Sequence, residues 1–346
     1  MIPLSEIPLP EIPLSKIPLS VLDLATVATG STPADALHET LATARDAERL
    51  GYRRLWVAEH HAMVAVASSA PAVLVAELAN ATTTLRVGAG GVMLPNHAPL
   101  VVAEQFATLE ALHPGRIDLG LGRAPGTDPI TARALRRAAD HGARFPDDVV
   151  ELLNYLEPRD HPAHPAPTPG AGYRPEVWLL GSSTFSAQLA GTLGLPFSFA
   201  YHFAPALIDQ ALSLYRRTFA PSRFLATPYA MVAVSVLCAP TDDEARFLAG
   251  SAAHHALQRA TGHPGTLPSP EEAAAHPLTP GEASLVADVT RGHVVGSPEV
   301  VHDGLAALVT RTGANELMVS TRAFALDARL RSLELVAATW GTTETS

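Results

Sequence analysis

The chain has 346 residues, of which 47% are hydrophobic, and its formal net charge is -10 at pH 7. The acidic balance argues against a broad nucleic-acid surface, and no apolar run is long enough, at about 18 residues, to predict a membrane helix. A single cysteine, Cys238, excludes an intramolecular disulfide, and with no secretory signal pattern we expect a cytoplasmic protein. Cys238 closes the apolar run MVAVSVLC, which favours a buried strand residue over a reactive thiol.

The chain begins with a proline-containing pentad repeated over residues 2–20, as IPLSE, IPLPE, IPLSK and IPLS. Each proline removes an amide donor and fixes the backbone, so neither a helix nor a central strand can run through the repeat. We therefore predict an extended low-complexity tail over residues 1–18, with a docking peptide as the alternative.

From residue 19 onward, short apolar runs alternate with segments of helical spacing. The predicted strands are residues 21–28, 55–58, 85–94, 116–122, 176–180, 196–200, 229–239 and 316–320. The predicted helices are residues 33–50, 70–81, 99–113, 146–156, 183–192, 207–219, a helix beginning near 241, 297–313 and 328–338. Strands that alternate with helices indicate a parallel α/β sheet, and eight such strands predict a closed (β/α)8 TIM barrel. We expect one barrel domain over residues 19–340, with insertions at about 124–174 and 262–292.

The two insertions differ in composition. The first contains a loop dense in histidine and proline, in which His161 and His164 suggest a metal site, although the alternating prolines prevent the two side chains from converging easily. Residues 262–281 are rich in proline, glycine and alanine, and we predict a loop that covers the barrel mouth.

The active site of such a barrel is built from side chains at the strand ends and in the loops that follow. The residues predicted at this mouth are Glu59, His60, Gly90, Gly91, Arg123, Gly181, Ser182 and Tyr201. Arg123 lies in the loop GLGRAPGTD, and LLGSSTFS opens a helix after the fifth strand. A helix start with free NH groups, serines and a nearby arginine suits a phosphate, although small residues there are also common caps. The glycines of VGAGG either let a planar ring approach the backbone or form a tight strand exit.

These segments together resemble the bacterial luciferase-like flavin monooxygenases, in a superfamily that also contains reductases using the deazaflavin coenzyme. The resemblance runs from about residue 19 to residue 338. Its motifs are WVAEHH, VGAGGVMLPNHAPLVVAEQFATLEALHPGRIDLGLGRAPGTD, WLLGSS and ELMVS, which match the family in order and spacing. The resemblance implies a barrel of eight strands and helices that is usually dimeric, so we expect a homodimer.

The resemblance also implies roles around the flavin ring. His60 matches the family histidine that assists proton transfer near the reacting flavin edge, with a core histidine as the alternative. Glu59 matches a flavin-pocket acid, or else is a solvated rim carboxylate. Gly90 and Gly91 match the place where the family often carries a cis bond without proline. Tyr201 falls where an aromatic side chain flanks the flavin in luciferase, with barrel packing as the alternative.

The flavin phosphate is assigned through the same resemblance. Arg123 matches a phosphate-binding arginine, and Arg133 matches a second one unless it is an ordinary helix-surface residue. Ser182 and Ser183, which follow Gly181, correspond to the phosphate-binding serine region, with Ser186 one helical turn further on. One departure is Gly122, which stands where luciferase has a reactive cysteine and puts light emission in doubt.

The predicted function is that of a monooxygenase that takes reduced FMN from a separate flavin reductase and uses O2 to oxygenate a small organic substrate. Four small or apolar residues are predicted as walls for that substrate: Val57, Ala58, Gly88 and Ala89. GLGRAP lacks the third glycine of the dinucleotide pattern, so no nicotinamide site is predicted.

Three alternatives remain. The first is a deazaflavin-dependent oxidoreductase that transfers hydride without oxygen, and the second is a flavin-binding protein without catalysis. The third is a metal hydrolase that uses Glu59, His60, His61 and His97, which we disfavour because adjacent histidines on a strand point to opposite sides. We expect no metal, no nucleic acid and no membrane among the partners.

Overall fold

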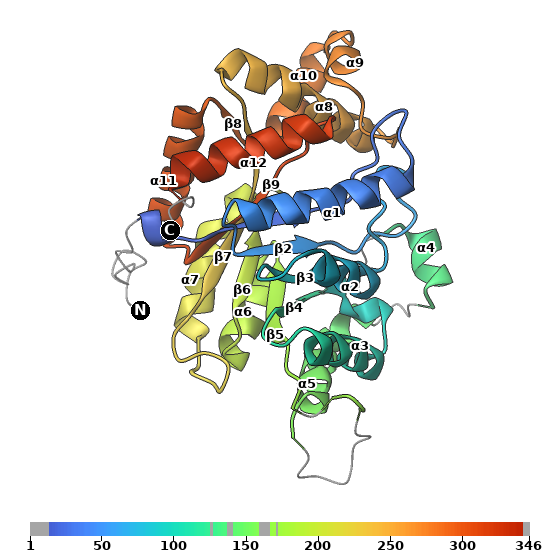
Figure 1. The fold of residues 1–346 in the computed structure, drawn as a ribbon, viewed down its shortest axis with the longest axis vertical. Coiled ribbons are helices and arrows are strands. Elements are labelled where there is room, and N and C mark those ends of the chain that lie inside the picture. Colours follow the sequence, from blue (N-terminus) through green and yellow to red (C-terminus); the bar gives the residue numbers. More distant parts are fainter. Residues whose placement is uncertain (1–13, 125–126, 137–140, 159–166, 171, 342–346) are drawn as a thin grey trace.

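The fold is a closed barrel of eight parallel strands, as predicted. The computed structural model describes residues 14–124, 127–136, 141–158, 167–170 and 172–341 (Figure 1). The barrel strands are β1 (Leu19–Asp23), β2 (Arg54–Val57), β3 (Arg86–Met93), β4 (Ile117–Gly122), β5 (Glu176–Gly181), β6 (Phe197–Ala200), β7 (Ala230–Cys238) and β9 (Glu316–Ser320). Each strand pairs with its neighbour, β6 pairs with β7, and β9 joins β7 to β1, which closes the ring. The (β/α)8 prediction is therefore confirmed.

Helices surround the barrel and supply the return path from each strand to the next (Figure 1). They are α1 (Pro33–Arg49), α2 (Pro71–Ala81), α3 (Pro99–Leu112), α5 (His141–Tyr155), α6 (Thr184–Leu193), α7 (Ile208–Thr218), α11 (Pro298–Thr312) and α12 (Leu326–Trp340). Local chemistry fixes their ends. For example, Thr32 and Asp35 form a reciprocal capping box before α1, and Gly313 ends α11 in a left-handed conformation.

The structure adds elements that the sequence analysis did not predict. Strand β8 (Val294–Gly296) pairs with β7 alone among the described strands and lies outside the barrel ring. The prediction of a loop over residues 262–281 is wrong. This segment contains α9 (Pro270–Ala274) and the start of α10 (Pro280–Val289). These two helices pack on α8 (Asp242–Ala260). The first insertion contains α4 (Pro129–Ala134), and short 3-10 helices span Leu14–Lys16, Leu94–Asn96 and Pro205–Leu207.

The boundary of the predicted tail also changes. Ile17 is only 2% exposed, and its carbonyl oxygen accepts a hydrogen bond of 2.8 Å from Nε1 of Trp340 on the last helix. The end of the predicted 1–18 tail therefore belongs to the folded barrel, because Ile17 packs in the main core.

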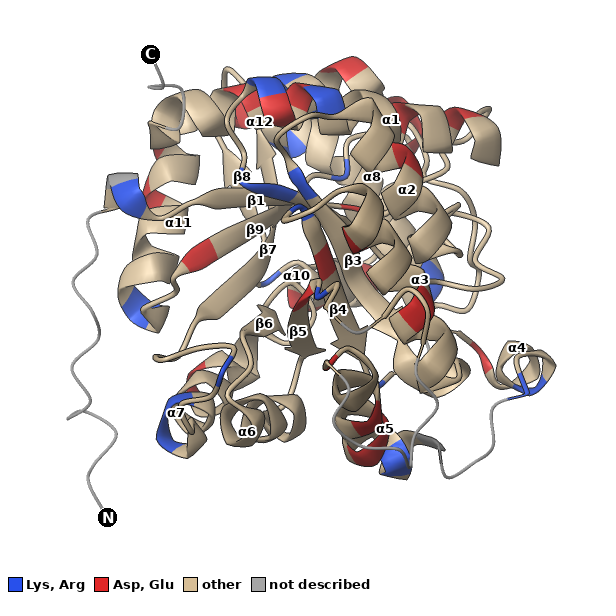
Figure 2. Ribbon diagram, turned by 60° about the horizontal axis from the view of Figure 1, so that its bottom comes forward, with Lys and Arg blue, Asp and Glu red and all other residues tan. Residues whose placement is uncertain are grey.

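The barrel interior is layered along its axis. At the amino-terminal ends of the strands, Nη1 of the buried Arg54 donates to Asp118 (2.7 Å) and its Nε donates to Glu316 (2.9 Å). Figure 2 shows red and blue segments on the barrel strands themselves. Above this layer lie Trp56 and Trp178, whose rings meet edge to face with centroids 5.3 Å apart. Charged groups and indoles thus fill the lower barrel, which leaves space only toward the carboxyl ends of the strands.

Among the described residues, no helix is both long enough and apolar enough to cross a membrane. The described side chains likewise contain no group of three or more histidine, cysteine, aspartate or glutamate residues arranged to hold a metal ion. His161 and His164 lie outside the described residues.

Candidate active site

A cavity of about 250 Å³ opens at the carboxyl ends of the barrel strands, above the tryptophan layer. Eight of the predicted site residues line it: His60, Gly90, Gly91, Arg123, Gly181, Ser182, Ser183 and Ser186. They come from the ends of strands β2 to β5 and from the start of α6, so residues far apart in the sequence converge on one space. This is the convergence expected of a barrel active site.

One side of the cavity is made by the first turn of α6. Ser183 is its N-cap residue but makes no capping hydrogen bond with its side chain, and Ser186 is buried one turn further on. The guanidinium carbon of Arg123 lies 4.0 Å from the ring centroid of Phe185, which holds this cation against the same turn. Gly181 must lack a side chain, because an added Cβ would lie 2.7 Å from Cβ of Ser186. The helix start, hydroxyl groups and arginine are the donor set that a phosphate requires.

The wall beside this turn is backbone. The peptide bond between Gly90 and Gly91 is cis, in agreement with the expectation drawn from the resemblance. A Cβ on Gly91 would lie 2.7 Å from the carbonyl oxygen of Gly120 and would also collide with Leu180. His60 lines the same cavity, and its backbone NH donates to the carbonyl oxygen of Ser68 at 2.9 Å. A flat ligand in this cavity can therefore approach the main chain closely.

Glu59 does not line the cavity, which corrects its predicted contact with the flavin. The side chain is fully buried, so it is not a solvated rim carboxylate either. Its oxygens accept hydrogen bonds from His61 (2.8 Å), His97 (2.9 Å), Asn96 (3.0 Å) and the backbone NH of Met93 (2.9 Å). Burial raises the pKa of Glu59, but the hydrogen bonds and the charge of His97 outweigh burial and lower the pKa below its usual value. Glu59 is thus an ionised anchor for the segment that leaves β3.

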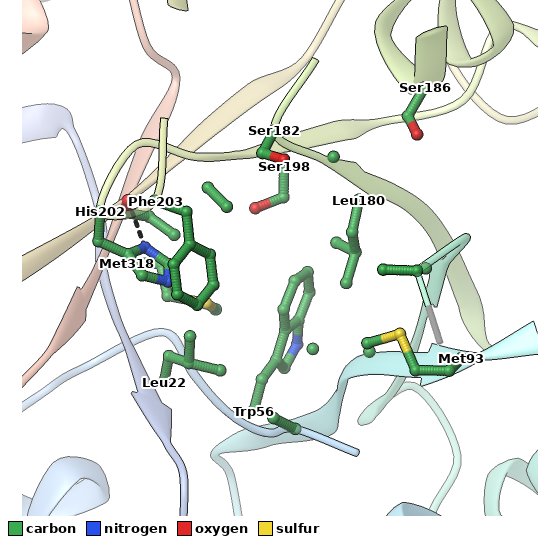
Figure 3. Close-up of a pocket in the computed structure, with 18 of the residues that line it drawn as sticks. Leu22, Trp56, Met93, Leu180, Ser182, Ser186, Ser198, His202, Phe203 and Met318 are labelled. Carbon is green, nitrogen blue, oxygen red and sulfur yellow. Dashed lines mark hydrogen bonds between the residues drawn. The ribbon is translucent and has the colours of Figure 1, made fainter. Parts of the chain in front are cut away.

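Two further predictions of flavin contact are also corrected. Arg133 is exposed on α4 and is not among the residues that line the cavity. Tyr201 turns away from the cavity toward Gly292 and is hydrogen-bonded to Arg311. The aromatic side chains at this position of the mouth are instead His202 and Phe203, whose ring centroids are 4.2 Å apart (Figure 3).

The substrate wall is also only partly as predicted. Ala58 lines the cavity, whereas Val57 and Ala89 are buried in the core outside the barrel interior, and Gly88 packs lower, against Asp118. The apolar lining that the sequence analysis missed includes Leu24 and, as Figure 3 shows, Leu22, Trp56, Met93, Leu180 and Met318. These residues lie on or next to barrel strands and face inward. Every second residue of a barrel strand faces inward, but the residues between them are apolar too, so the sequence does not show which ones line the cavity.

Gly122 lies on the cavity wall beside Met93. A Cβ at Gly122 would be 2.8 Å from Sδ of Met93, so the methionine side chain already occupies the space there. A thioether therefore stands beside the position at which the resemblance places a cysteine in luciferase.

The chain is similar to known proteins over most of its length. The model of the luciferase-like monooxygenase family matches residues 17–316. A luciferase-like monooxygenase of Escherichia coli (strain K12) is 48% identical over 314 residues, which cover 90% of this chain and 94% of the relative. The crystal structure of apo-MsnO8 has a TM-score of 0.87 at 37% identity and covers 94% of this chain and 99% of its own.

A more distant structure shares the fold. The oxygenating constituent of 3,6-diketocamphane monooxygenase from Pseudomonas putida, a type II Baeyer-Villiger monooxygenase solved in complex with FMN, has a TM-score of 0.71 at 20% identity. The match covers 93% of this chain and 97% of that one.

Proposed function

Because the chain belongs to the luciferase-like monooxygenase family, we propose that it uses reduced FMN and O2 to oxygenate a small organic substrate. The observation that carries this proposal is that one cavity is lined by a phosphate-type donor set at α6, by a glycine backbone wall and by His60. When bound, the reduced flavin would react with O2, and the protein would orient the flavin and the substrate and set their electrostatic environment.

The phosphate group would be held at the start of α6. The first-turn NH groups, Ser182, Ser183 and Ser186 can donate to phosphate oxygens, and Arg123 adds a cation at the same end. A phosphate there would orient the rest of the flavin along the cavity toward Gly90 and Gly91.

The reacting end of the cavity combines an imidazole with apolar walls. His60 would hold or release a proton close to the flavin edge, since an imidazole titrates near neutral pH. Trp56, Leu180 and Met318 exclude water from the same space, which protects reactive species from hydrolysis.

The supply of electrons forms part of the proposal. A separate flavin reductase would deliver reduced FMN, because the loop GLGRAP lacks the third glycine of a dinucleotide site. We propose further that the protein acts in the cytoplasm as a homodimer.

Anaerobic titration with reduced FMN, followed by rapid mixing with oxygenated buffer, tests the proposal. We expect saturable binding and a delay in the appearance of oxidised FMN, relative to reduced FMN in buffer alone. A parallel titration with the reduced deazaflavin coenzyme is the control for cofactor choice. Failure to bind reduced FMN, or oxidation as fast as in buffer, would overturn the proposal, and selective binding of the deazaflavin would favour hydride transfer.

A further inference from the structure

A cluster of basic side chains extends from His202, which lines the cavity, to residues of α8. Its members are His202, His255, Arg259, His293 and Arg322, which come from four separate segments of the chain. Within the described residues, the charges that act on His202, His255, His293 and Arg322 are those of other histidines and arginines, and none is a carboxylate. Basic residues that are grouped without an acidic partner are unusual in a chain whose net charge is -10.

Arg322 is the centre of this cluster. It follows β9 by two residues, and its Nη2 donates to Nδ1 of His255 at 2.7 Å. His255 in turn donates from Nε2 to the carbonyl oxygen of Gly265 at 3.2 Å, so a neutral imidazole fixes the guanidinium in place. The Nε atom of Arg322 is buried and has no hydrogen-bond partner among the described residues. A donor that is buried without a partner costs free energy unless a ligand satisfies it.

The charge of the cluster at neutral pH resides on its arginines. Burial, together with the charges of Arg322 and Arg259, lowers the pKa of His255 to about 4. Burial and the charges of His202 and Arg322 lower the pKa of His293 to about 4 as well. Burial and the charge of Arg259 lower the pKa of Arg322 only to about 10, so its guanidinium stays protonated at neutral pH.

His202 connects the cluster to the cavity. It lines the cavity, and its Nδ1 donates to the carbonyl oxygen of Ala233 at 3.0 Å, which fixes the ring on the β7 side. Figure 3 shows His202 and Met318 on one side of the cavity, with Ser186 and Met93 on the other. The cluster therefore adjoins the side of the cavity that lies across from Ser186 and Met93.

We propose that Arg322 binds a carboxylate group of the organic substrate, whose apolar part enters the cavity past His202. This inference rests on the proposed function for the identity of the reaction and names the class of substrate. A planar carboxylate matches the forked donors of a guanidinium and would satisfy Nε of Arg322.

The test is calorimetric titration of the full chain with hexanoate and with 1-hexanol, two probes with the same carbon number. We expect Arg322→Met to weaken hexanoate binding by about tenfold or more while 1-hexanol binding stays within about twofold. Arg322→Lys, which keeps the charge, should recover part of the affinity for hexanoate. The matched control is Arg246→Met on α8, because Arg246 is exposed and already paired with Asp243, and it should alter neither affinity.

Folding and site identity are checked with the same variants. The melting temperature of Arg322→Met should stay close to that of the wild type, because removal of a charge without an acidic partner offsets the loss of the hydrogen bond to His255. Hexanoate affinity that is equal in wild type and Arg322→Met, or a matching loss for 1-hexanol, would overturn the inference.

Reduced FMN and riboflavin distinguish the substrate from the cofactor as the source of the anion. If Arg322→Met weakened FMN but not riboflavin, the cluster would be the phosphate site and the inference would be wrong. The probe titrations need no flavin, so their result stands apart from the proposed function. Hexanoate binding that depends on Arg322 without any reduced FMN binding would refute the monooxygenase proposal alone, and the reverse pattern would refute this inference alone.

Discussion

Arg123 and Arg133 show how much the role of a residue depends on its place in the fold. Both match phosphate-binding positions by resemblance, yet Arg123 packs against Phe185 at the cavity, whereas Arg133 is exposed on α4. Only the first can act together with the NH groups at the start of α6 on one ligand.

This difference gives a prediction at the scale of the residue. Arg123→Gln should weaken reduced FMN binding by about tenfold or more, because a charged hydrogen bond to phosphate is lost. Riboflavin, which lacks the phosphate, should bind the variant as it binds the wild type. Anaerobic titrations measure both affinities, and Arg133→Gln is the matched control. Equal losses in the two variants would contradict the placement of the phosphate.

The different placements of Glu59 and Tyr201 share one physical cause. Side chains alternate across a strand, and the alternation continues past its end. Ala58 and His60 line the cavity, so Glu59 between them points to the opposite side. In the same way, Ala200 and His202 line it, and Tyr201 between them does not. The sequence identified the correct loops but did not assign the face of each residue, because it does not show where the strand geometry stops.

At the scale of the element, the approach of β3 to β4 sets the shape of the cavity wall. A Cβ on Gly120 would lie 2.3 Å from the carbonyl oxygen of Ala89, which is backbone and cannot rotate away. Gly281, in contrast, lies in α10 with open space around its Cα and without a positive φ.

These two glycines give opposite predictions. Gly120→Ala should lower the free energy of unfolding by about 2 kcal/mol or more, because the strands must separate to admit the methyl group. Gly281→Ala should leave it unchanged or raise it by about 0.5 kcal/mol, because alanine favours the helix and meets no neighbour. Urea unfolding followed by circular dichroism measures both. A stable Gly120→Ala variant would show that the two strands can part at little cost.

The strands and helices of the barrel were predicted, whereas α9, α10 and β8 were not. Ser269 and Glu272 form a capping box before α9, and Thr279 and Glu282 form another before α10. Both sites have the S/T-x-x-E pattern, so the sequence did contain the signal for these helices. The high content of proline and glycine concealed it. Strand β8 has three residues and no periodicity to detect.

At the scale of the whole molecule, closure of the barrel joins the two ends of the described chain. β1 pairs with β9, and the segment before β1 packs under the last helix through Ile17 and Trp340. Ile17 therefore contributes to the stability of the closed barrel, although the pentad repeat predicts that it belongs to an extended tail.

Ile17→Ala should reduce the free energy of unfolding by about 2–4 kcal/mol, because it leaves a cavity in the core. Thermal and urea unfolding provide the measurement. The control is Val101→Ala, at a side chain that is 46% exposed on α3 and should have little effect. If Ile17→Ala were as stable as the wild type, the folded domain would begin later than we describe.

The layering of the barrel also bears on how such a protein can diverge from its ancestors. The buried charges around Arg54 and the indoles above them lie at the opposite end of the strands from the loops that shape the mouth. Substitutions in those loops do not alter the packing of the charged residues and tryptophans in the barrel, so a lineage can acquire new substrate specificity without losing the ability to fold. Descendants of one such barrel can therefore keep the same lower half while their upper halves become adapted to different compounds.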